Sequence, residues 1–458
     1  MERNLTEGKI YRNIVLFALP IFLGQLFQQL YNVADSLVVG KFVGKEALAA
    51  VSSSGNLIFL LVGFIQGVFI GAGVVIGRYY GAKEFDKVHK AVHTTVAFGL
   101  LAGIFLTIFG ILATPLILKL MKTPEDVLPL STLYFRIYFA GSIGNILYNT
   151  FNGIFHARGD SQHPLYYLII SSVLNVALDL LFVAVFKWGV AGAAAATAVA
   201  HFVSAGISLI KLMRVNDVHK VVLKEVRLDP HLFREILKTG LPAGVQNSVI
   251  SFANVIVQSN INVFDTDAMA GCGAYSKIEG FAFLPVTSFS MALTTFTSQN
   301  LGAKKYDRVK KGAGFGVGFG VLIAELIGVI CILFAPQLIG IFTDAPEVID
   351  YGVREIKTEA LFFCLLSFSH CLAGIMRGAG KTTVPMAVML ICWCVIRIIY
   401  ITVMTHVIPD TIEVIFWAYP ITWFLSSVCF TVYYFKADWM HNFERQEQKE
   451  LLKQGKKN

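Results

Sequence analysis

Apolar segments long enough to cross a lipid bilayer recur throughout this chain and constrain its fold more than any other feature. A transmembrane helix needs about 20 predominantly apolar residues, because each residue adds only about 1.5 Å of length. Twelve segments meet this requirement, at residues 14–39, 48–77, 91–118, 131–155, 164–186, 189–213, 240–264, 270–299, 312–341, 355–376, 383–408 and 412–435. The sequence therefore predicts an all-α membrane protein with twelve transmembrane helices, six on each side of a polar connector.

The composition agrees with this fold class. Hydrophobic residues make up 55% of the chain and charged residues 15%, whereas a soluble domain has about 25% charged residues. The mean hydropathy is +0.65. A net charge of +8 also occurs in nucleic-acid-binding proteins, but here the basic residues lie in short loops between apolar segments. We therefore expect a lipid bilayer, and no nucleic acid, around this chain.

The distribution of Lys and Arg predicts the orientation in the membrane. Of the 38 basic residues, 28 lie on the side of the N-terminus, 7 lie on the opposite side and the rest lie within or at the edge of spans. Positively charged loops stay in the cytoplasm, so both chain ends are expected there. The expected domains are a first six-helix lobe (1–213), a cytoplasmic connector (214–238), a second six-helix lobe (239–437) and a charged cytoplasmic tail (438–458).

An internal repeat relates the two lobes. Three motifs of the first half recur in the second: Ala18-Leu19-Pro20 as Gly240-Leu241-Pro242, the loop 80–88 as 301–309, and Gly153, Gly159 and Pro164 as Gly374, Gly380 and Pro385. The last two matches share an offset of 221 in residue number, and the first match has an offset of 222. Since six spans is an even number, the halves are parallel repeats with a pseudo-two-fold axis along the membrane normal. This arrangement is typical of transporters that bind substrate between the repeats.

Four polar side chains of the first half lie at one predicted depth. Asp35 and Asp179 are five and seven residues from the outer ends of their spans, and Asn175 shares a helix face with Asp179. Thr197 lies eight residues into the sixth span. Two carboxylates in a dry pocket should not both stay ionised, so a proton or a bridging cation such as Na⁺ is expected at Asp35 and Asp179. The alternative is that they only hold helices together through hydrogen bonds.

The second half does not repeat this pocket. The offset of 221 carries Asp35, Asn175 and Asp179 to Ile256, Ile396 and Tyr400. Ion coupling is therefore expected in the first lobe alone. Arg397, Glu325 and Lys277 also lie in or at the edge of spans of the second half, and their roles stay open.

Further polar residues are candidates for a substrate cavity and a hinge. The candidates for cavity lining are Gln29, Asn32, Asn152, Gln246 and Glu279. Pro20 is the candidate hinge, because a proline inside a helix removes one backbone hydrogen bond and favours a bend. The alternative is that Pro20 only starts its helix. No catalytic constellation is visible, so we expect no enzymatic activity, and the absence of a Walker A motif excludes ATP as the energy source.

The chain resembles bacterial members of the multidrug and toxic compound extrusion (MATE) family over residues 10–437. The residues that carry the resemblance are VADSLVVGKFVGKEALAAV (33–51), the paired loops YYGAKEFDKV and NLGAKKYDRV, the paired motifs HARGDSQHP and MRGAGKTTVP, and NVALD in the fifth span. The resemblance implies a two-lobe exporter that exchanges inward H⁺ or Na⁺ for an outward cationic or amphiphilic compound. The family's first-lobe cation site matches Asp35, Asn175, Asp179 and Thr197.

The resemblance also limits what is expected elsewhere. Some family members carry acids in spans 7 and 10, where this chain has Gln246 and the segment with Ser367, Ser369 and His370. A second-lobe cation site is therefore not expected. We expect a monomer in the bacterial inner (plasma) membrane, with no cofactor beyond the coupling ion. A lipid-linked oligosaccharide flippase of a related fold and a passive channel are the alternatives.

Overall fold

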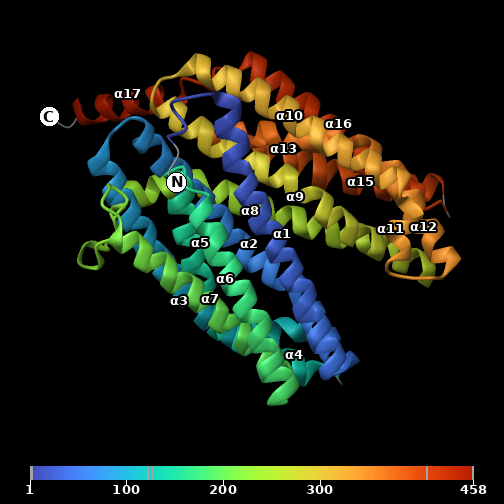
Figure 1. The fold of residues 1–458 in the computed structure, drawn as a ribbon. Coiled ribbons are helices and arrows are strands. Elements are labelled where there is room, and N and C mark those ends of the chain that lie inside the picture. Colours follow the sequence, from blue (N-terminus) through green and yellow to red (C-terminus); the bar gives the residue numbers. More distant parts are fainter. Residues whose placement is uncertain (1–3, 121–122, 126, 409–410, 456–458) are drawn as a thin grey trace. The chain divides into compact units, whose positions relative to one another are not determined.

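The computed structural model describes residues 4–120, 123–125, 127–408 and 411–455 (Figure 1), and these residues are almost entirely helical. The first half contains α1 (Ile10–Phe42), α2 (Lys45–Gly81), α3 (Phe85–Leu120), α4 (Leu128–Ala140), α5 (Ser142–Ala157), α6 (Gln162–Asp179), η1 (Leu180–Val185), α7 (Val190–Arg214) and η2 (Leu223–Glu225). The second half contains α8 (Pro230–Ile261), α9 (Thr266–Gly302), α10 (Tyr306–Leu333), α11 (Ala335–Gly340), α12 (Pro346–Glu359), η3 (Ala360–Phe362), α13 (Phe363–Gly378), α14 (Thr383–Met389), η4 (Leu390–Ile396), α15 (Arg397–Val407), α16 (Glu413–Lys436) and α17 (Asn442–Gly455).

Ten helical stretches of the described residues are long and apolar enough to cross a membrane. They correspond to ten of the twelve predicted spans. The other two are helical as well, but differ from a plain apolar helix. The predicted span 131–155 is divided at Gly141 into α4 and α5, each shorter than a bilayer crossing. The predicted span 240–264 lies in α8, which contains Gln246, Asn247 and Asn254 and begins at Pro230, inside the predicted connector.

The two halves repeat the same helices at a nearly constant spacing. The starts of α2, α3, α5 and α6 differ in residue number from those of α9, α10, α13 and α14, respectively, by 221 in every case. Lys83 and Lys304, in the turns after α2 and α9, share a left-handed backbone with φ of 59° and 56°. Residues other than glycine rarely adopt this conformation. The repeat seen in the sequence therefore extends to the backbone.

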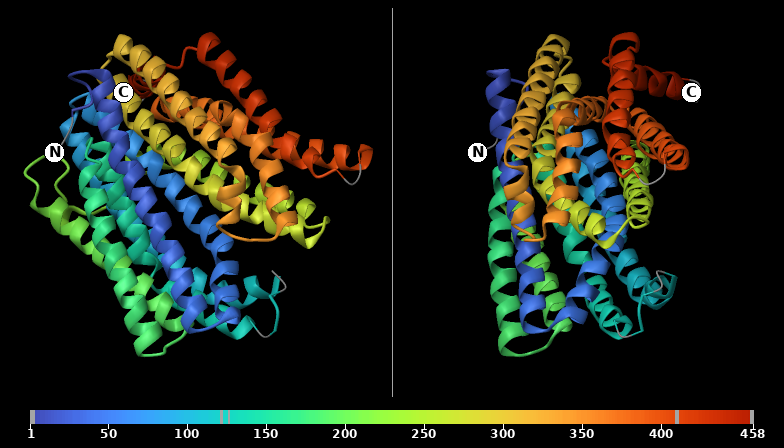
Figure 2. Two further views of the ribbon diagram at one scale, coloured as in Figure 1. Left: turned by 45° about the vertical axis from the view of Figure 1, so that its right-hand side comes forward. Right: turned by 90° about the vertical axis from the view of Figure 1, so that its right-hand side faces the viewer.

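The described chain forms two compact units that exchange the beginnings of two helices. The first unit contains Leu23–Gly244, and the second contains Leu5–Phe22 and the chain from Val245 onward. As a result, α1 begins in the second unit and ends in the first, while α8 does the reverse. Both helices continue through a proline, Pro20 or Pro242, that lies two residues before the change of unit. The unbroken course of α1, in blue, is visible in Figure 2.

Glycines allow α8 to enter the first unit closely against α2. A β-carbon added at Gly71 would lie 2.3 Å from the Cα of Gly240, and one added at Gly67 would lie 2.3 Å from the backbone nitrogen of Gly244. Each helix thus contributes two glycines four residues apart. Small residues at this spacing let the backbones of membrane helices touch. Any side chain at these positions would push α2 and α8 apart.

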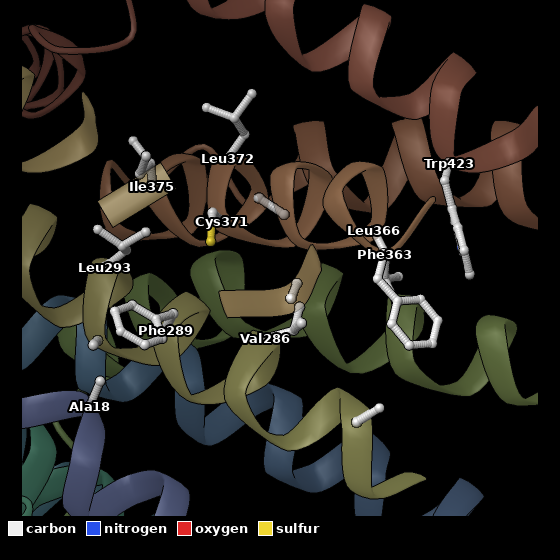
Figure 3. Close-up of a cluster of buried hydrophobic side chains, with 14 of the residues drawn as sticks. Ala18, Val286, Phe289, Leu293, Phe363, Leu366, Cys371, Leu372, Ile375 and Trp423 are labelled. Atoms are coloured by element: carbon white, nitrogen blue, oxygen red, sulfur yellow. The ribbon is translucent and has the colours of Figure 1, made fainter. Parts of the chain in front are cut away.

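The second unit is built around packing between α9 and α13. Figure 3 shows Phe289 and Leu293 of α9 beside Cys371 of α13, in a cluster of buried apolar side chains. Two hydrogen bonds tie the same helices together, because Ser290 Oγ donates to the His370 carbonyl at 2.6 Å and Thr294 Oγ1 donates to the Gly374 carbonyl at 3.0 Å. Gly374 leaves room for this approach, since a β-carbon there would lie 2.4 Å from the Ser290 carbonyl oxygen.

The segment between α7 and α8 lies against the first unit through named polar contacts. The backbone N–H of Val222 donates to His93 Nε2 at 3.0 Å, and that of Asp229 donates to Thr94 Oγ1 at 3.2 Å. Asp217 pairs with Arg158 at 2.7 Å. These contacts hold residues 215–229, which we call the connector segment, against α3 and the end of α5.

Candidate functional site

The structure brings the four predicted coupling residues together in the first unit. Asp35 comes from α1, Asn175 and Asp179 from α6, and Thr197 from α7. All four side chains are buried, and Asp179 is fully so. Asn175 Nδ2 donates to Thr197 Oγ1 at 3.4 Å, and Thr197 Oγ1 donates to the Ala193 carbonyl at 3.1 Å. The charges of Asp35 and Asp179 are near enough to interact.

Oxygen atoms without partners are the main property of this pocket. Both carboxylate oxygens of Asp179, Oδ1 of Asp35 and Oδ1 of Asn175 are buried and accept no hydrogen bond from the described residues. Buried polar atoms normally have partners, and a pair of unpartnered carboxylates is costly in a membrane interior. Hard cations prefer ligands of this kind, and a proton on one carboxyl group would relieve the same cost. The pocket can therefore hold a proton or a small cation.

The backbone changes its winding directly beside this pocket. The α-helix α6 ends at Asp179, and the π-helix η1 begins at the next residue. Such π turns are rare and concentrate at functional sites. Small residues at the start of α7 let the two helices approach, since a β-carbon added at Gly192 would lie 3.1 Å from the backbone of Phe182 in η1.

Two tyrosine side chains lie near the two carboxylates. Tyr31 of α1 and Tyr134 of α4 both lie near enough to interact electrostatically with Asp35 and Asp179. Tyr138, one turn after Tyr134, accepts a hydrogen bond from Asn145 of α5 at 3.3 Å. Hydroxyl groups can donate to a carboxylate without bringing a positive charge. The first unit thus offers its acids neutral neighbours.

The remaining predicted residues divide between the two units. Gln29, Asn32 and Asn152 lie in the first unit, and the buried amide oxygen of Asn152 has no partner among the described residues. Gln246 and Glu279 lie in the second unit, where Gln246 is buried and donates to Met389 Sδ at 2.7 Å. A cavity shared by these residues stays a prediction. Pro20 lies ten residues after the start of α1, so it does not merely begin that helix.

Glu325, whose role the sequence leaves open, has a structural partner. Its Oε2 accepts the backbone N–H of Cys364 at 3.1 Å, at the beginning of α13. Backbone N–H groups at a helix start have no partner within the helix and favour a negative charge. Glu325 therefore stabilises the start of α13.

A second group of buried ionisable side chains lies in the second unit. Glu355 and Glu359 of α12 face Cys272, Tyr275 and Glu279 of α9, and Arg397 of α15 lies near enough to interact with two of the three acids. Tyr275 Oη donates to Glu359 Oε2 at 2.9 Å. Glu359 Oε1 and Glu355 Oε2 are buried and have no hydrogen-bond partner among the described residues.

Sequence reasoning misses Glu355 and Glu359 for an identifiable reason. Among the acids, the repeat is used only to find second-half counterparts of Asp35 and Asp179, and these counterparts are apolar or aromatic residues. Applied in the other direction, the offset of 221 leads from Glu355 and Glu359 to Tyr134 and Tyr138. The spacing of four residues, which places both acids on one helix face, is the signal that could have identified them.

A group of possible metal ligands lies at the connector segment. His89 Nε2 and Glu225 Oε2 are 2.6 Å apart, and His93 lies beside them. Both ring nitrogens of His93 are already engaged, since Nδ1 contacts the His89 carbonyl at 2.7 Å and Nε2 accepts from Val222. A metal would have to displace one of these bonds, so the group is better explained by attachment of the connector segment to α3.

Comparisons with known proteins identify the family. The family model described as MatE matches residues 20–181 and again 242–403, once on each half of the chain. The probable multidrug resistance protein YoeA of Bacillus subtilis is 28% identical over 94% of both chains. The probable multidrug resistance protein NorM of Thermotoga maritima is 25% identical and covers 83% of this chain and 82% of its own length.

Solved structures agree with the family model. An outward-facing multidrug resistance MATE family transporter of the MOP superfamily matches with a TM-score of 0.88 and 21% identity, over 94% of this chain and 96% of its own. This likeness confirms the predicted fold of twelve transmembrane helices in two lobes. The chain therefore belongs to the MatE family, and it is a multi-pass membrane transporter rather than an enzyme.

Proposed function

We propose that this protein exports cationic or amphiphilic organic compounds in exchange for inward H⁺ or Na⁺. The names of its relatives support export of drugs. The observation that carries the antiport proposal is the pocket of Asp35 and Asp179, where three buried carboxylate oxygens have no partner among the described residues. No further cofactor is needed, since the ion gradient supplies the energy.

In this proposal the carboxylates change their occupancy during each cycle. A proton or Na⁺ entering the pocket neutralises one negative charge, and its departure restores the charge. The occupied and the empty pocket differ strongly in electrostatic energy, because the site is dry. Asn175 and Thr197 supply additional oxygens and hold the helices α6 and α7 together. Substrate would bind in a cavity lined by Gln29, Asn32, Asn152, Gln246 and Glu279.

We also propose that Pro20 is a hinge of α1. This proline lies fifteen residues before Asp35 on the same helix and two residues before the helix passes from one unit to the other. Substituting Pro20→Ala would restore a backbone hydrogen bond and stiffen α1. The expected result is slower efflux with unchanged cation binding at the Asp35 pocket. An equal loss of binding and efflux would contradict the hinge.

The setting of the protein is proposed on the same grounds. The excess of Lys and Arg on one side supports an orientation with both termini in the cytoplasm. We propose a monomer in the bacterial inner membrane. The bilayer is its only expected permanent partner. Accessibility of single cysteines placed at the two ends to a membrane-impermeant reagent in intact cells tests the orientation, and labelling of either end from outside would contradict it.

Transport in proteoliposomes tests the coupling pocket. Ethidium movement is followed in vesicles with a pH gradient alone, with a Na⁺ gradient alone and with none. Asp35→Asn and Asp179→Asn should each abolish gradient-driven movement, while the exposed Asp307→Asn serves as a matched control of the same chemistry. Normal transport by both pocket variants, or full transport by the wild type without any gradient, would overturn the proposal.

A further inference from the structure

The acids of the second unit take the places of tyrosines in the first. The helix pair α12–α13 repeats the pair α4–α5, since α5 and α13 both begin and end at the same offset of 221. At this spacing Glu355 and Glu359 correspond to Tyr134 and Tyr138. One member of each pair lies near the charged group of its own unit: Tyr134 near Asp35 and Asp179, and Glu359 near Arg397. The two units therefore carry polar side chains at corresponding positions of the repeat, but these are neutral tyrosines in the first unit and acids in the second.

A basic residue of the second unit takes the place of a coupling residue of the first. The π-helix η4 precedes Arg397, whereas the π-helix η1 follows Asp179. A π turn holds one residue more than an α turn, so the spacing grows from 221 at the starts of α6 and α14 to 222 for residues that follow η4 in one half and precede η1 in the other. The two family matches are offset by 222 over their whole length, at their starts as well as at their ends. Arg397 then corresponds to Asn175. The helices α7 and α16 end 222 residues apart, and at that spacing Tyr419 corresponds to Thr197.

The contacts agree with this correspondence. In the first unit, Asn175 reaches across to Thr197. In the second unit, the Arg397 guanidinium lies 4.2 Å from the centre of the Tyr419 ring. Arg397 is 2% exposed, and its Nε and Nη2 donate to Thr422 Oγ1 at 3.2 and 2.8 Å. A buried guanidinium is stable only with compensating groups around it, and here these are an aromatic face, a hydroxyl and nearby carboxylates.

We propose that the Arg397 guanidinium is a resident counter-ion for the group Glu279, Glu355 and Glu359, so that the second unit takes up no coupling cation. The other groups facing this location are Tyr275 and Cys272 of α9, Cys394 of η4 and Tyr419 of α16. None of these is cationic. Arg397 supplies one positive charge, and its removal leaves one charge to be replaced when at least one of the three carboxyl groups is ionised beside it. The described residues of the first unit place no such resident cation at Asp35 and Asp179, whose carboxylates stay open to an ion from solution.

Cation binding to purified protein tests this inference separately from transport. The background is the double variant Asp35→Asn/Asp179→Asn, into which Arg397→Met or Arg397→Lys is introduced. Binding of ²²Na⁺ is measured by scintillation proximity, and proton binding by potentiometric titration. The Met variant should gain one cation, as Na⁺ or as an added proton, relative to the background. The Lys variant should gain none, because it keeps a tethered positive charge.

Each outcome decides the proposal. A well-folded Met variant that gains no cation would overturn it, as would a Lys variant that gains as much as the Met variant. Should the Met variant fail to fold, the pair Arg397→Met/Glu359→Gln replaces it. Removing both opposite charges should restore the cooperative thermal unfolding transition that Arg397→Met alone then lacks, and a pair without that transition would also overturn the proposal. The quantity compared is the number of cations bound by each Arg397 variant minus the number bound by the double variant. The comparison is therefore valid even when the double variant still binds cations.

Discussion

The two repeats of this protein share their helices but differ in how they treat buried acids. In the first unit, the described residues around Asp35 and Asp179 are tyrosines, an amide and a hydroxyl, without a resident cation. In the second unit, Glu279 and Glu359 have Arg397 nearby, at the place of Asn175. One duplicated scaffold therefore holds an open site and a self-compensated one. This difference indicates that ion coupling depends less on the presence of buried carboxylates than on whether the neighbouring helices already place a positive charge beside them.

The largest expected contrast is between Asp179→Asn and Glu359→Gln. Asp179→Asn should lower the initial rate of gradient-driven ethidium efflux at least ~100-fold, equivalent to about 2.7 kcal/mol. Glu359→Gln should leave efflux within about threefold of the wild type, because its amide oxygen can still accept from Tyr275 while Glu279 still lies near Arg397. Both are measured in the same proteoliposomes. The comparison fails when Glu359→Gln stops efflux and Asp179→Asn does not.

The second contrast concerns helix crossings at corresponding places. Gly71 of α2 touches the backbone of Gly240, so Gly71→Ala should destabilise the first unit by about 3 kcal/mol or more through overpacking. The counterpart of Gly71 in α9 is Ala292, which is buried in a cluster that also contains Ala18, the counterpart of Gly240. Ala292→Gly should cost only about 1 kcal/mol. Thermal unfolding in detergent compares the two, and similar losses would show that the crossings are equally close.

Much of this arrangement could be predicted from the sequence because membrane helices obey simple constraints. Span length, the charges of loops and the repeat determine the fold class, and depth together with helical spacing selects Asp35, Asn175, Asp179 and Thr197. Each of these predictions uses the sequence of a single helix or a comparison of the two halves of the sequence. The π turn before Arg397 is different, because it shifts the register by one residue without any Gly or Pro to mark it.

The second acid group was not predictable for a related reason. Glu355 and Glu359 lie at the start of a predicted span, where charged residues usually face the membrane surface. Their burial depends on α9 and α15, which are distant in the sequence. Likewise, the partner of Glu325 is a backbone N–H that becomes available only because α13 begins beside it. The exchange of helix starts at Pro20 and Pro242 also depends on long-range contacts, which no local pattern reveals.

The third contrast is between the segments that precede each repeat, and it is the smallest. Before the first repeat, the carbonyls of Leu5, Glu7 and Gly8 accept hydrogen bonds from Arg308, whose guanidinium stays charged at any physiological pH. Before the second repeat, the connector segment instead buries His219 beside Tyr80 and Asp217. The two attachments should therefore respond differently to acid.

The direction of that response follows from the pKa of His219. Burial lowers the pKa of His219 below its usual value, an effect that the neighbouring Asp217 opposes and the Arg158 charge reinforces. Attachment of the connector segment is then most stable above the unfolded value of about 6.5 and weakens as the pH falls through and below it. Amide hydrogen exchange at pH 7.5 and pH 5.5 measures this, after correction for intrinsic rates. Residues 215–229 should lose protection at pH 5.5 while residues 5–8 do not, and His219→Gln should remove the difference. Equal changes in both segments, or an unchanged connector segment in the wild type, would contradict a role for His219 and leave the two attachments equivalent.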